Sequence, residues 1–222
     1  MIRGLIFDFD GLILETESPI FQSWQELYQA HGCVLTIEMW ASIIGTAEEL
    51  FDPLVELDKQ AGRRLDRASI APQRLQREKE LIAAQTVMPG VKDYLHSARQ
   101  LGLKTAVASS SDREWVTGHL ERIGLLNFFD CIKTREDVHS TKPDPALFLA
   151  ALACLGLRPN QAIVFEDSPN GIRASKEARI FCVAVPNAMT RGLPLDQADV
   201  KIDSLMDLSL HALLQLVNSN NR

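Results

Sequence analysis

The sequence predicts an α/β protein in which a doubly wound parallel sheet carries an inserted helical region. Short apolar segments alternate with segments of helical periodicity, a pattern typical of parallel strands that helices cover on both faces. The stretch between the first two apolar segments is much longer than the others and shows no strand pattern. At 222 residues, the chain has the length for one full domain plus a sizeable insertion.

Short segments with the composition of buried strands recur along the chain. They are Ile2–Asp8, Leu103–Ala108, Cys131–Ile132, Ala162–Phe165 and Ile180–Val185. The strand pattern of Cys131–Ile132 is weaker than that of the others. Because these segments are apolar at successive positions, we expect them to be buried on both faces of one sheet.

The helical segments between these strands carry start and stop signals. One set of apolar positions spans residues 91–101 and ends before a glycine. A second follows Asp112, which suits an N-cap, and stops at Gly124. A third follows Pro145 and stops at Gly156. An acidic N-cap, a proline in the first turn and a glycine just past the end are typical helix boundaries.

We place the helical insertion at residues 15–87. A helix is expected to begin at Ser18-Pro19, and the later helical segments cover residues 38–44, 47–57 and 69–84. Residues 1–14 and 88–222 then form the core domain, which has a usual size for a doubly wound sheet.

Charge and apolar content exclude several classes of protein. The chain has 23 Lys and Arg against 29 Asp and Glu, a net charge of −6, which argues against a general nucleic-acid binder. The longest near-continuous apolar run, Ala146–Leu157, is too short to span a bilayer. The first residues show no secretory signal pattern. We therefore expect a cytoplasmic protein, a monomer or weak dimer, with no nucleic-acid or membrane partner.

The cysteines and histidines show no metal-binding or redox spacing. Cys33, Cys131, Cys154 and Cys182 are scattered and include no Cys-x-x-Cys pair. We expect them to be reduced and mostly buried. The five histidines never fall into a zinc spacing. The candidate residues for chemistry are therefore carboxylates, hydroxyls and a lysine.

An acid pair, Asp8 and Asp10, ends the first strand. Alternation along a strand puts both carboxylates on one side, and functional sites in doubly wound sheets collect at the carboxyl ends of strands. Two such acids repel each other unless a cation lies between them or one is protonated. Gly11 permits a tight turn after them. Taken alone, this pattern also fits a strand end with two solvated acids.

Later strand-to-helix connections add complementary groups. The second strand runs into a hydroxyl cluster at a helix N-terminus, where backbone N–H groups suit a phosphate; its residues are Ser109, Ser110, Ser111 and Asp112. Lys142 lies in a turn before another helix, and Glu166 and Asp167 end the fourth strand. Four acids at one edge of a sheet would be costly without a metal, and hard oxygen ligands favour Mg²⁺ over zinc.

The order and spacing of these motifs resemble the haloacid dehalogenase superfamily, in the group close to β-phosphoglucomutases and small sugar-phosphate phosphatases. The segment Asp8-Phe9-Asp10-Gly11-Leu12-Ile13 is similar to the first family motif, Ser109 to the second and Lys142 to the third. The segment Glu166-Asp167-Ser168-Pro169-Asn170-Gly171 is similar to the fourth. The resemblance spans essentially the whole chain and implies a Rossmann-like core with a helical cap at residues 15–87.

The resemblance also implies catalytic and metal-binding roles. Asp8 would be the nucleophile that forms an aspartyl phosphate. Asp10 would protonate the leaving group and then deprotonate the attacking water. The Asp8 carboxylate, the Asp10 backbone carbonyl and Asp167 would hold Mg²⁺, and Glu166 would ligate it directly or lie just behind those ligands.

The remaining motif residues would contact the phosphoryl group and the rest of the substrate. Ser109, the Ser110 backbone N–H and Lys142 would hold the phosphoryl oxygens. On the substrate side we place Glu15, Ser111 and Asp112. Glu15 stands where an Asp is commoner in the family. Because Asp10 is present, and dehalogenases do not keep this second acid, phosphoryl transfer is favoured over dehalogenation.

The cap sequence favours hydrolysis of a small phosphorylated metabolite, with sugar phosphates among the candidates. Residues 4–58 contain no Lys or Arg, so this region offers no cation to a second phosphate. Similar phosphomutases use a His four residues after the threonine that corresponds to Thr16 in this chain. They also use an Arg in the early cap loop. This chain has Ile20 and the loop 45–49, which carries two glutamates, in those places.

Other functions remain open at this point. One alternative is a phosphomutase of the β-phosphoglucomutase type on the same scaffold. Another is a phospho-acceptor signalling domain, which also places strand-end acids, a hydroxyl and a lysine around Mg²⁺. Such signalling domains are shorter and lack a helical insertion, which counts against this reading.

Overall fold

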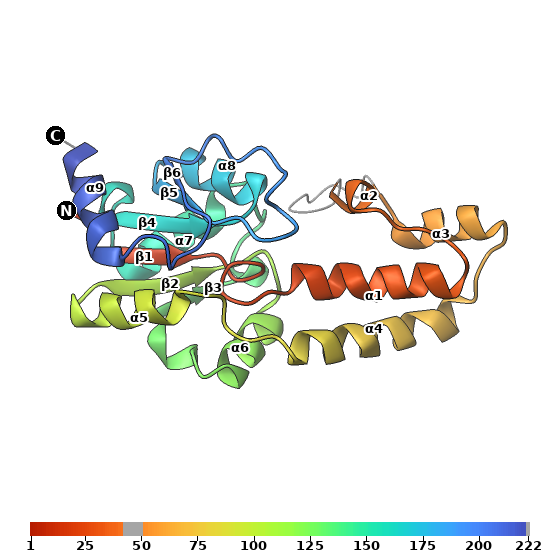
Figure 1. The fold of residues 1–222 in the computed structure, drawn as a ribbon. Helices are drawn as coiled ribbons and strands as arrows, with labels where there is room; N and C mark the ends of the chain where they lie inside the picture. The colour runs from red at the N-terminus through yellow and green to blue at the C-terminus, as the bar shows by residue number, and fades with distance from the viewer. Residues whose placement is uncertain (42–50, 221–222) are drawn as a thin grey trace.

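The core of the molecule is a six-stranded, wholly parallel sheet with strand order β3-β2-β1-β4-β5-β6. The computed structural model describes residues 1–41 and 51–220 (Figure 1). The strands are β1 (Gly4–Phe7), β2 (Lys104–Ala108), β3 (Cys131–Lys133), β4 (Ala162–Glu166), β5 (Phe181–Ala184) and β6 (Val200–Lys201). The predicted doubly wound parallel sheet is confirmed. The short β6 at the sheet edge was not predicted, because two residues are too few to show a strand pattern.

Two hydrophobic clusters cover the two faces of this sheet. Alternate residues of the strands enter different clusters, so that Leu5 and Phe7 of β1 belong to one and Ile6 to the other. The first cluster is closed by α5 (Val91–Gln100), α6 (Arg113–Arg122) and α9 (Leu210–Asn220). The second is closed by α7 (Ala146–Leu155) and α8 (Pro169–Glu177). Burial on both faces explains why the strand segments are apolar throughout.

The ends of these helices follow the boundary signals in the sequence. The Asp112 side chain accepts a hydrogen bond from Trp115 N at 2.8 Å and caps α6. Ser168 does the same for Gly171 N at 3.1 Å, at the start of α8. Gly156 ends α7 in the left-handed region, at φ 65°. In the described part of the chain, three single-turn 3₁₀ helices complete the connections, η1 (Leu126–Phe128), η2 (Arg135–Asp137) and η3 (Pro159–Gln161).

A separate group of helices projects beyond the carboxyl ends of the central strands (Figure 1). It consists of α1 (Glu17–Ala30), α2 (Ile37–Ala41), α3 (Pro53–Ala61) and α4 (Arg67–Ala83). Here α1 and α4 lie side by side, and the Arg74 guanidinium stacks 4.5 Å from the centre of the Trp24 ring. A third hydrophobic cluster lies among these helices, including Tyr28 and Leu57.

Two short segments join this helical region to the sheet. Leu14 pairs with Val87 in an isolated antiparallel bridge, and Met88 N donates to Ile13 O at 2.9 Å. Both crossings therefore run next to each other at the carboxyl end of β1, beside the loop that carries Asp8 and Asp10.

The helix predicted over residues 47–57 is displaced in the structure. The described part of it begins at Pro53, because Asp52 accepts hydrogen bonds from Leu54 N and Val55 N and caps the helix there. It continues to Ala61 and ends before Gly62. The predicted helix over 38–44 corresponds to α2, and its last residues, with residues 47–50, lie outside the described part of the chain.

The prediction of four reduced cysteines was wrong for one pair. Cys131, at the start of β3, and Cys154, near the end of α7, form a disulfide with their Cα atoms 6.4 Å apart. Helix α7 packs on β3, which brings together two residues 23 positions apart in the sequence. This pairing depends on tertiary packing and leaves no local spacing pattern. Cys33 and Cys182 are free and buried.

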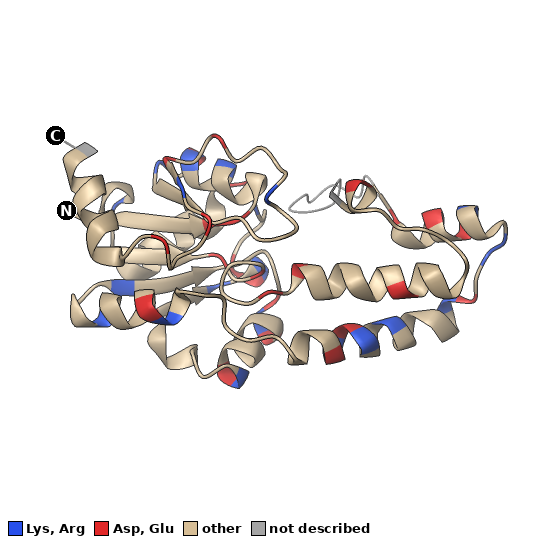
Figure 2. Cartoon of the chain, in the orientation of Figure 1, with Lys and Arg blue, Asp and Glu red and all other residues tan. Residues whose placement is uncertain are grey.

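Charged residues of both signs are spread along the sheet domain and the helical region (Figure 2). Glu26 of α1 pairs with Arg77 of α4 at 2.7 Å, so part of the acidic character of the early helical region is neutralised within it. Among the residues that the structure describes, no helix combines the length and apolar content required to cross a bilayer.

Candidate active site

The loop after β1 carries Asp8 and Asp10 across the carboxyl edge of the sheet. Asp8 N donates to Phe165 O at 3.0 Å, so the chain still follows β4 at this position. Gly11 then turns the loop at φ 76°. A side chain at Gly11 would collide with the amide of Asn187 and approach the carboxylate of Asp167. The turn therefore requires glycine for both its conformation and its close packing.

Lys142 lies at the centre of the buried charges. Its Nζ donates to Asp8 Oδ1 and, at 2.6 Å, to Glu166 Oε1. All of these side chains are buried. Burial alone would lower the pKa of Lys142, but the two carboxylates outweigh it and raise the pKa above its ordinary value. Lys142 therefore stays charged and links the first and fourth strands of the predicted site.

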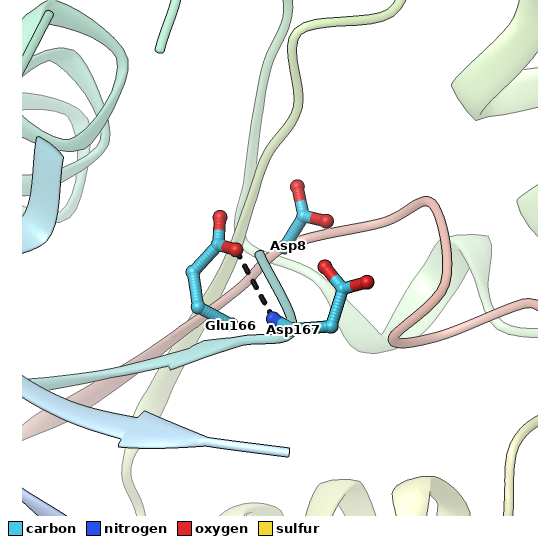
Figure 3. Close-up of side chains that lie close together, drawn as sticks. All are labelled: Asp8, Glu166 and Asp167. Atoms are coloured by element: carbon cyan, nitrogen blue, oxygen red, sulfur yellow. Dashed lines mark hydrogen bonds between the residues drawn. The ribbon is translucent and has the colours of Figure 1, made fainter. Parts of the chain in front are cut away.

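Glu166 is fixed from both sides. Its Oε2 accepts hydrogen bonds from Asp167 N at 3.1 Å, Ser168 N at 3.2 Å and Ser168 Oγ at 3.0 Å, while Oε1 faces Lys142. The bond to Asp167 N is drawn in Figure 3. Gly171, in the first turn of α8, leaves the room for this carboxylate, because a Cβ there would collide with it.

Three buried carboxylates converge at the ends of β1 and β4. Oxygens of Asp8, Glu166 and Asp167 lie within 4.8 Å of one another (Figure 3). Burial raises the pKa of Asp8 to about 8, opposed in part by Lys142 and reinforced by Glu166 and Asp10. Burial and the charge of Glu166 also raise the pKa of Asp167 well above its ordinary value. One lysine cannot balance these acids, and a divalent cation with oxygen ligands fits the donor set.

Asp10 accepts hydrogen bonds from four side chains. Thr16 Oγ1 and Trp115 Nε1 each donate to Oδ1 at 2.9 Å. Ser111 Oγ and Ser109 Oγ donate to Oδ2 at 2.6 and 3.3 Å. The contact with Trp115 was not predicted, because the position of Trp115 in the apolar periodicity of α6 indicates a core residue. Only the start of that helix beside the hydroxyl cluster could have placed its indole near the site.

A cavity of about 420 Å³ opens over these groups. It brings together most of the predicted site residues, namely Asp8, Asp10, Ser109, Ser110, Ser111, Asp112, Lys142 and Asp167. Glu166 lies behind them, fully buried. Trp115, Asn170 and Arg135 also line the cavity.

The structure places Glu15 and Glu17 differently from each other. Glu15 accepts a hydrogen bond from Ser18 N at 3.0 Å and lines a separate cavity of about 190 Å³, beside Met88 and Asn187. Glu17 and Ile20 are the residues of α1 that line the larger cavity. Burial, with the charges of Asp10 and Glu15, raises the pKa of Glu17 to about 7. Glu17 was not predicted as a site residue, because in the sequence it is one more acid in an acidic segment.

The fold and the converging motifs define a family. The chain matches the haloacid dehalogenase-like hydrolase family over residues 5–185, and it belongs to that family. This confirms the resemblance seen in the sequence. The matched region includes all four motifs and the helical insertion between the first and the second.

Individual relatives align with most or all of the chain. It is 42% identical to "Putative phosphatase YhcW" of Bacillus subtilis (strain 168) over 221 residues, which are 100% of both proteins. It is 28% identical to "Phosphorylated carbohydrates phosphatase" of Thermotoga maritima, with 81% of this chain and 82% of that protein aligned. A crystal structure of CbbY from Rhodobacter sphaeroides in complex with phosphate is 27% identical and has a TM-score of 0.75, covering 96% of this chain and 99% of that one.

Proposed function

We propose that the chain is a Mg²⁺-dependent phosphatase that hydrolyses a small phosphorylated metabolite through an aspartyl-phosphate intermediate. The observation that carries this proposal is the position of Asp8. Its carboxylate lies at the end of the central strand, lines the cavity and faces both Lys142 and the acid pair Glu166 and Asp167. Phosphatase names among the relatives support the same class of reaction.

Asp8 would attack phosphorus with a carboxylate oxygen. Lys142 holds Oδ1, and no donor from the described residues engages Oδ2. The lysine therefore fixes the orientation of the carboxylate and leaves Oδ2 available to attack phosphorus. The P–O bond to the leaving group breaks as the bond to Asp8 forms, and water then attacks phosphorus to release phosphate and restore the carboxylate.

Asp10 would move the protons. It lines the cavity two residues from Asp8 and is held in place by four hydrogen-bond donors. In the first step it gives a proton to the leaving-group oxygen, and in the second it takes one from the attacking water.

Ser109, the backbone of Ser110 and Lys142 would hold the phosphoryl oxygens. All three residues line the cavity, and Ser109 and Lys142 are buried at its base. Preorganised donors of this kind stabilise the charge that develops on a transferring phosphoryl group.

The Asp8 carboxylate, the Asp10 carbonyl and Asp167 would hold Mg²⁺. When bound, the ion offsets the repulsion between an anionic nucleophile and an anionic phosphate. Both oxygens of Glu166 are already engaged, by Lys142 and by the backbone N–H groups of Asp167 and Ser168 just before α8. This favours a role for Glu166 behind the metal ligands, where it positions Lys142 and Asp167.

Residues 15–87 would act as a cap over the core domain, which residues 1–14 and 88–222 form. The described cap residues that line the cavity, Glu17 and Ile20, bring no positive charge to it. Arg135, on the core side, lies 3.8 Å from Asp112. The side of the cavity formed by Glu17 and Ile20 suits a neutral, hydroxyl-rich leaving group such as a sugar better than a second phosphate. This favours a phosphatase over a phosphomutase. The predicted loop 45–49 lies outside the described residues.

The test is a phosphate-release screen with Mg²⁺ over sugar phosphates, nucleotides and small acid phosphates. We expect release from at least one class by the unaltered chain and none by Asp8→Asn, whose amide cannot act as the nucleophile. A folded Asp8→Asn variant with normal release would contradict the assignment. For the mutase alternative, β-glucose 1-phosphate is supplied with catalytic β-glucose 1,6-bisphosphate. Glucose 6-phosphate forming faster than free phosphate would favour the mutase.

A further inference from the structure

The turn that follows β5 places one amide against the proposed metal site. Asn187 is 4% exposed, and its Nδ2 donates to Asp167 Oδ2 at 2.7 Å and to Gly11 O at 3.2 Å. These partners belong to two different segments, the end of β4 and the loop after β1. One side chain therefore ties together the two segments whose residues would hold the metal.

The orientation of this amide is determined by its other contacts. Asn187 Oδ1 accepts hydrogen bonds from Met189 N at 2.8 Å and Thr190 N at 3.0 Å. Asn187 N donates to Thr190 Oγ1 at 3.1 Å. If the amide were flipped, its NH₂ group would face two N–H donors and its oxygen would face a carboxylate and a carbonyl. The hydrogen-bond network therefore requires Nδ2 on the side of Asp167.

The contact differs in kind from the contacts of Lys142. Lys142 brings a full positive charge, which competes with a cation for the negative charge of the carboxylates. An amide donor fixes one oxygen of Asp167 while leaving the charge of the carboxylate available to a metal. Residues that bind metal ligands in this way orient them and commonly change metal affinity by about 10- to 100-fold when they are replaced.

We propose that Asn187 is a positioning residue that holds Asp167 and the Gly11 turn in the arrangement that binds the divalent cation. The inference rests on the metal-binding part of the proposed function. Asn187 touches neither substrate nor reacting atoms in this account. Its effect is exerted through Asp167 Oδ2 and through the carbonyl of Gly11, the residue after Asp10.

The test measures cation binding by the full chain in the absence of substrate. Mn²⁺ is titrated and the free ion is followed by electron paramagnetic resonance. In Asn187→Ser the hydroxyl can still accept from the turn N–H groups but is too short to reach Asp167. We expect the dissociation constant for Mn²⁺ to rise about 10- to 100-fold in this variant. The matched control is Met189→Leu, in the same turn, which keeps the backbone N–H that donates to Asn187 Oδ1 and should keep the affinity of the unaltered chain.

A second measurement needs no variant. The side-chain amide of Asn187 in the unaltered chain, observed by ¹⁵N NMR, should shift on addition of Mg²⁺ and saturate with the binding of the ion. An amide signal that does not respond to bound Mg²⁺ would overturn the proposal, as would a folded Asn187→Ser variant with unchanged Mn²⁺ affinity. Equal losses in Asn187→Ser and Met189→Leu would also overturn it, because integrity of the turn would then explain the effect.

These outcomes separate this inference from the proposed phosphatase activity. If the unaltered chain binds no Mn²⁺, both the proposed metal site and the proposed role of Asn187 are contradicted. If Mn²⁺ binds with the expected difference between variants but no phosphate is released from any substrate, the proposed reaction is contradicted and the role of Asn187 is supported.

Discussion

Asp10 shows how one residue can depend on contacts distant in the sequence. Its four hydrogen-bond donors come from the segment before α1, the hydroxyl cluster after β2 and helix α6. Only the acid itself and the serines were predictable, because they belong to local motifs at strand ends. The contact with Trp115 joins residues 105 positions apart and has no local signature.

Replacing Asp10 should affect substrates according to their leaving groups. For Asp10→Ala we expect phosphorylation by a sugar phosphate to slow by about 100-fold or more, because the alkoxide leaves without a proton. Nitrophenyl phosphate should lose much less, since nitrophenolate is stable as an anion. Single-turnover rates of the phosphorylation step measure this. Equal losses for both substrates would contradict the acid role of Asp10.

Glu17 gives a prediction about pH and stability. Its pKa is raised from an ordinary 4.5 to about 7, so the folded state resists ionisation that the unfolded state undergoes freely. The stability that the protonated Glu17 side chain contributes to the fold is therefore fully present below about pH 4.5. It is lost as the pH rises through about 7. Glu17→Gln removes this loss and should stabilise the fold by about 1 to 3 kcal/mol at pH 8.

Urea unfolding of both proteins at pH 4.5 and pH 8 checks the Glu17 prediction. The difference in the free energy of unfolding should be small at the lower pH and clear at the higher one. A difference that is the same at both pH values would show that packing, and not ionisation, distinguishes Glu17 from Gln.

Two short crossings join the sheet domain to the group of helices α1 to α4, and these segments must adapt if the proposed cap closes. Residues 14–16 and 86–90 run beside each other through the Leu14 to Val87 bridge. We expect closure over a bound ligand to fix these segments and slow the exchange of their amide hydrogens. Hydrogen exchange with and without orthovanadate and Mg²⁺ measures this, and the interior of β4 serves as the internal control. Identical exchange of both crossings in the two states would contradict cap closure.

The helices and strands were predictable to different degrees. The buried strands and the capped helices of the core follow from local patterns, such as the apolar run of β4 and the Asp112 cap of α6. The start of α3 was misplaced, because the acidic segment before it has helical character while Asp52 and Pro53 set the actual boundary. Strand β6 depends on pairing with β5 and leaves almost no pattern of its own.

For the molecule as a whole, the Cys131 to Cys154 disulfide links α7 to the sheet. Closing a loop of this size restricts the unfolded chain, and reduction should lower the free energy of unfolding by about 3 kcal/mol. Urea unfolding with and without dithiothreitol measures the effect. Cys154→Ser is the control, because its free energy of unfolding should be close to that of the reduced chain and should not change when dithiothreitol is added. Equal stability of the oxidised and fully reduced unaltered chain would contradict the prediction.

The sequence could not have supplied this disulfide or the Asn187 contact, for the same physical reason. Both join groups that approach only after the sheet has assembled and its helices have packed, so no spacing in the chain encodes them. The acid pairs, the serines and Lys142 were predictable because parallel strands bring their carboxyl ends to one edge.

In the proposed mechanism, Asp8 carries the phosphoryl group during turnover. The enzyme is mixed with Mg²⁺ and acetyl phosphate, quenched in acid at intervals, and reduced with borohydride, which converts an aspartyl phosphate to homoserine. Peptide mass spectrometry then locates the modified residue. We expect homoserine at position 8, from a phosphoenzyme that decays within seconds of substrate exhaustion. Phosphate on a different residue, or a modified Asp8 that persists far longer, as in a signalling domain, would contradict this mechanism.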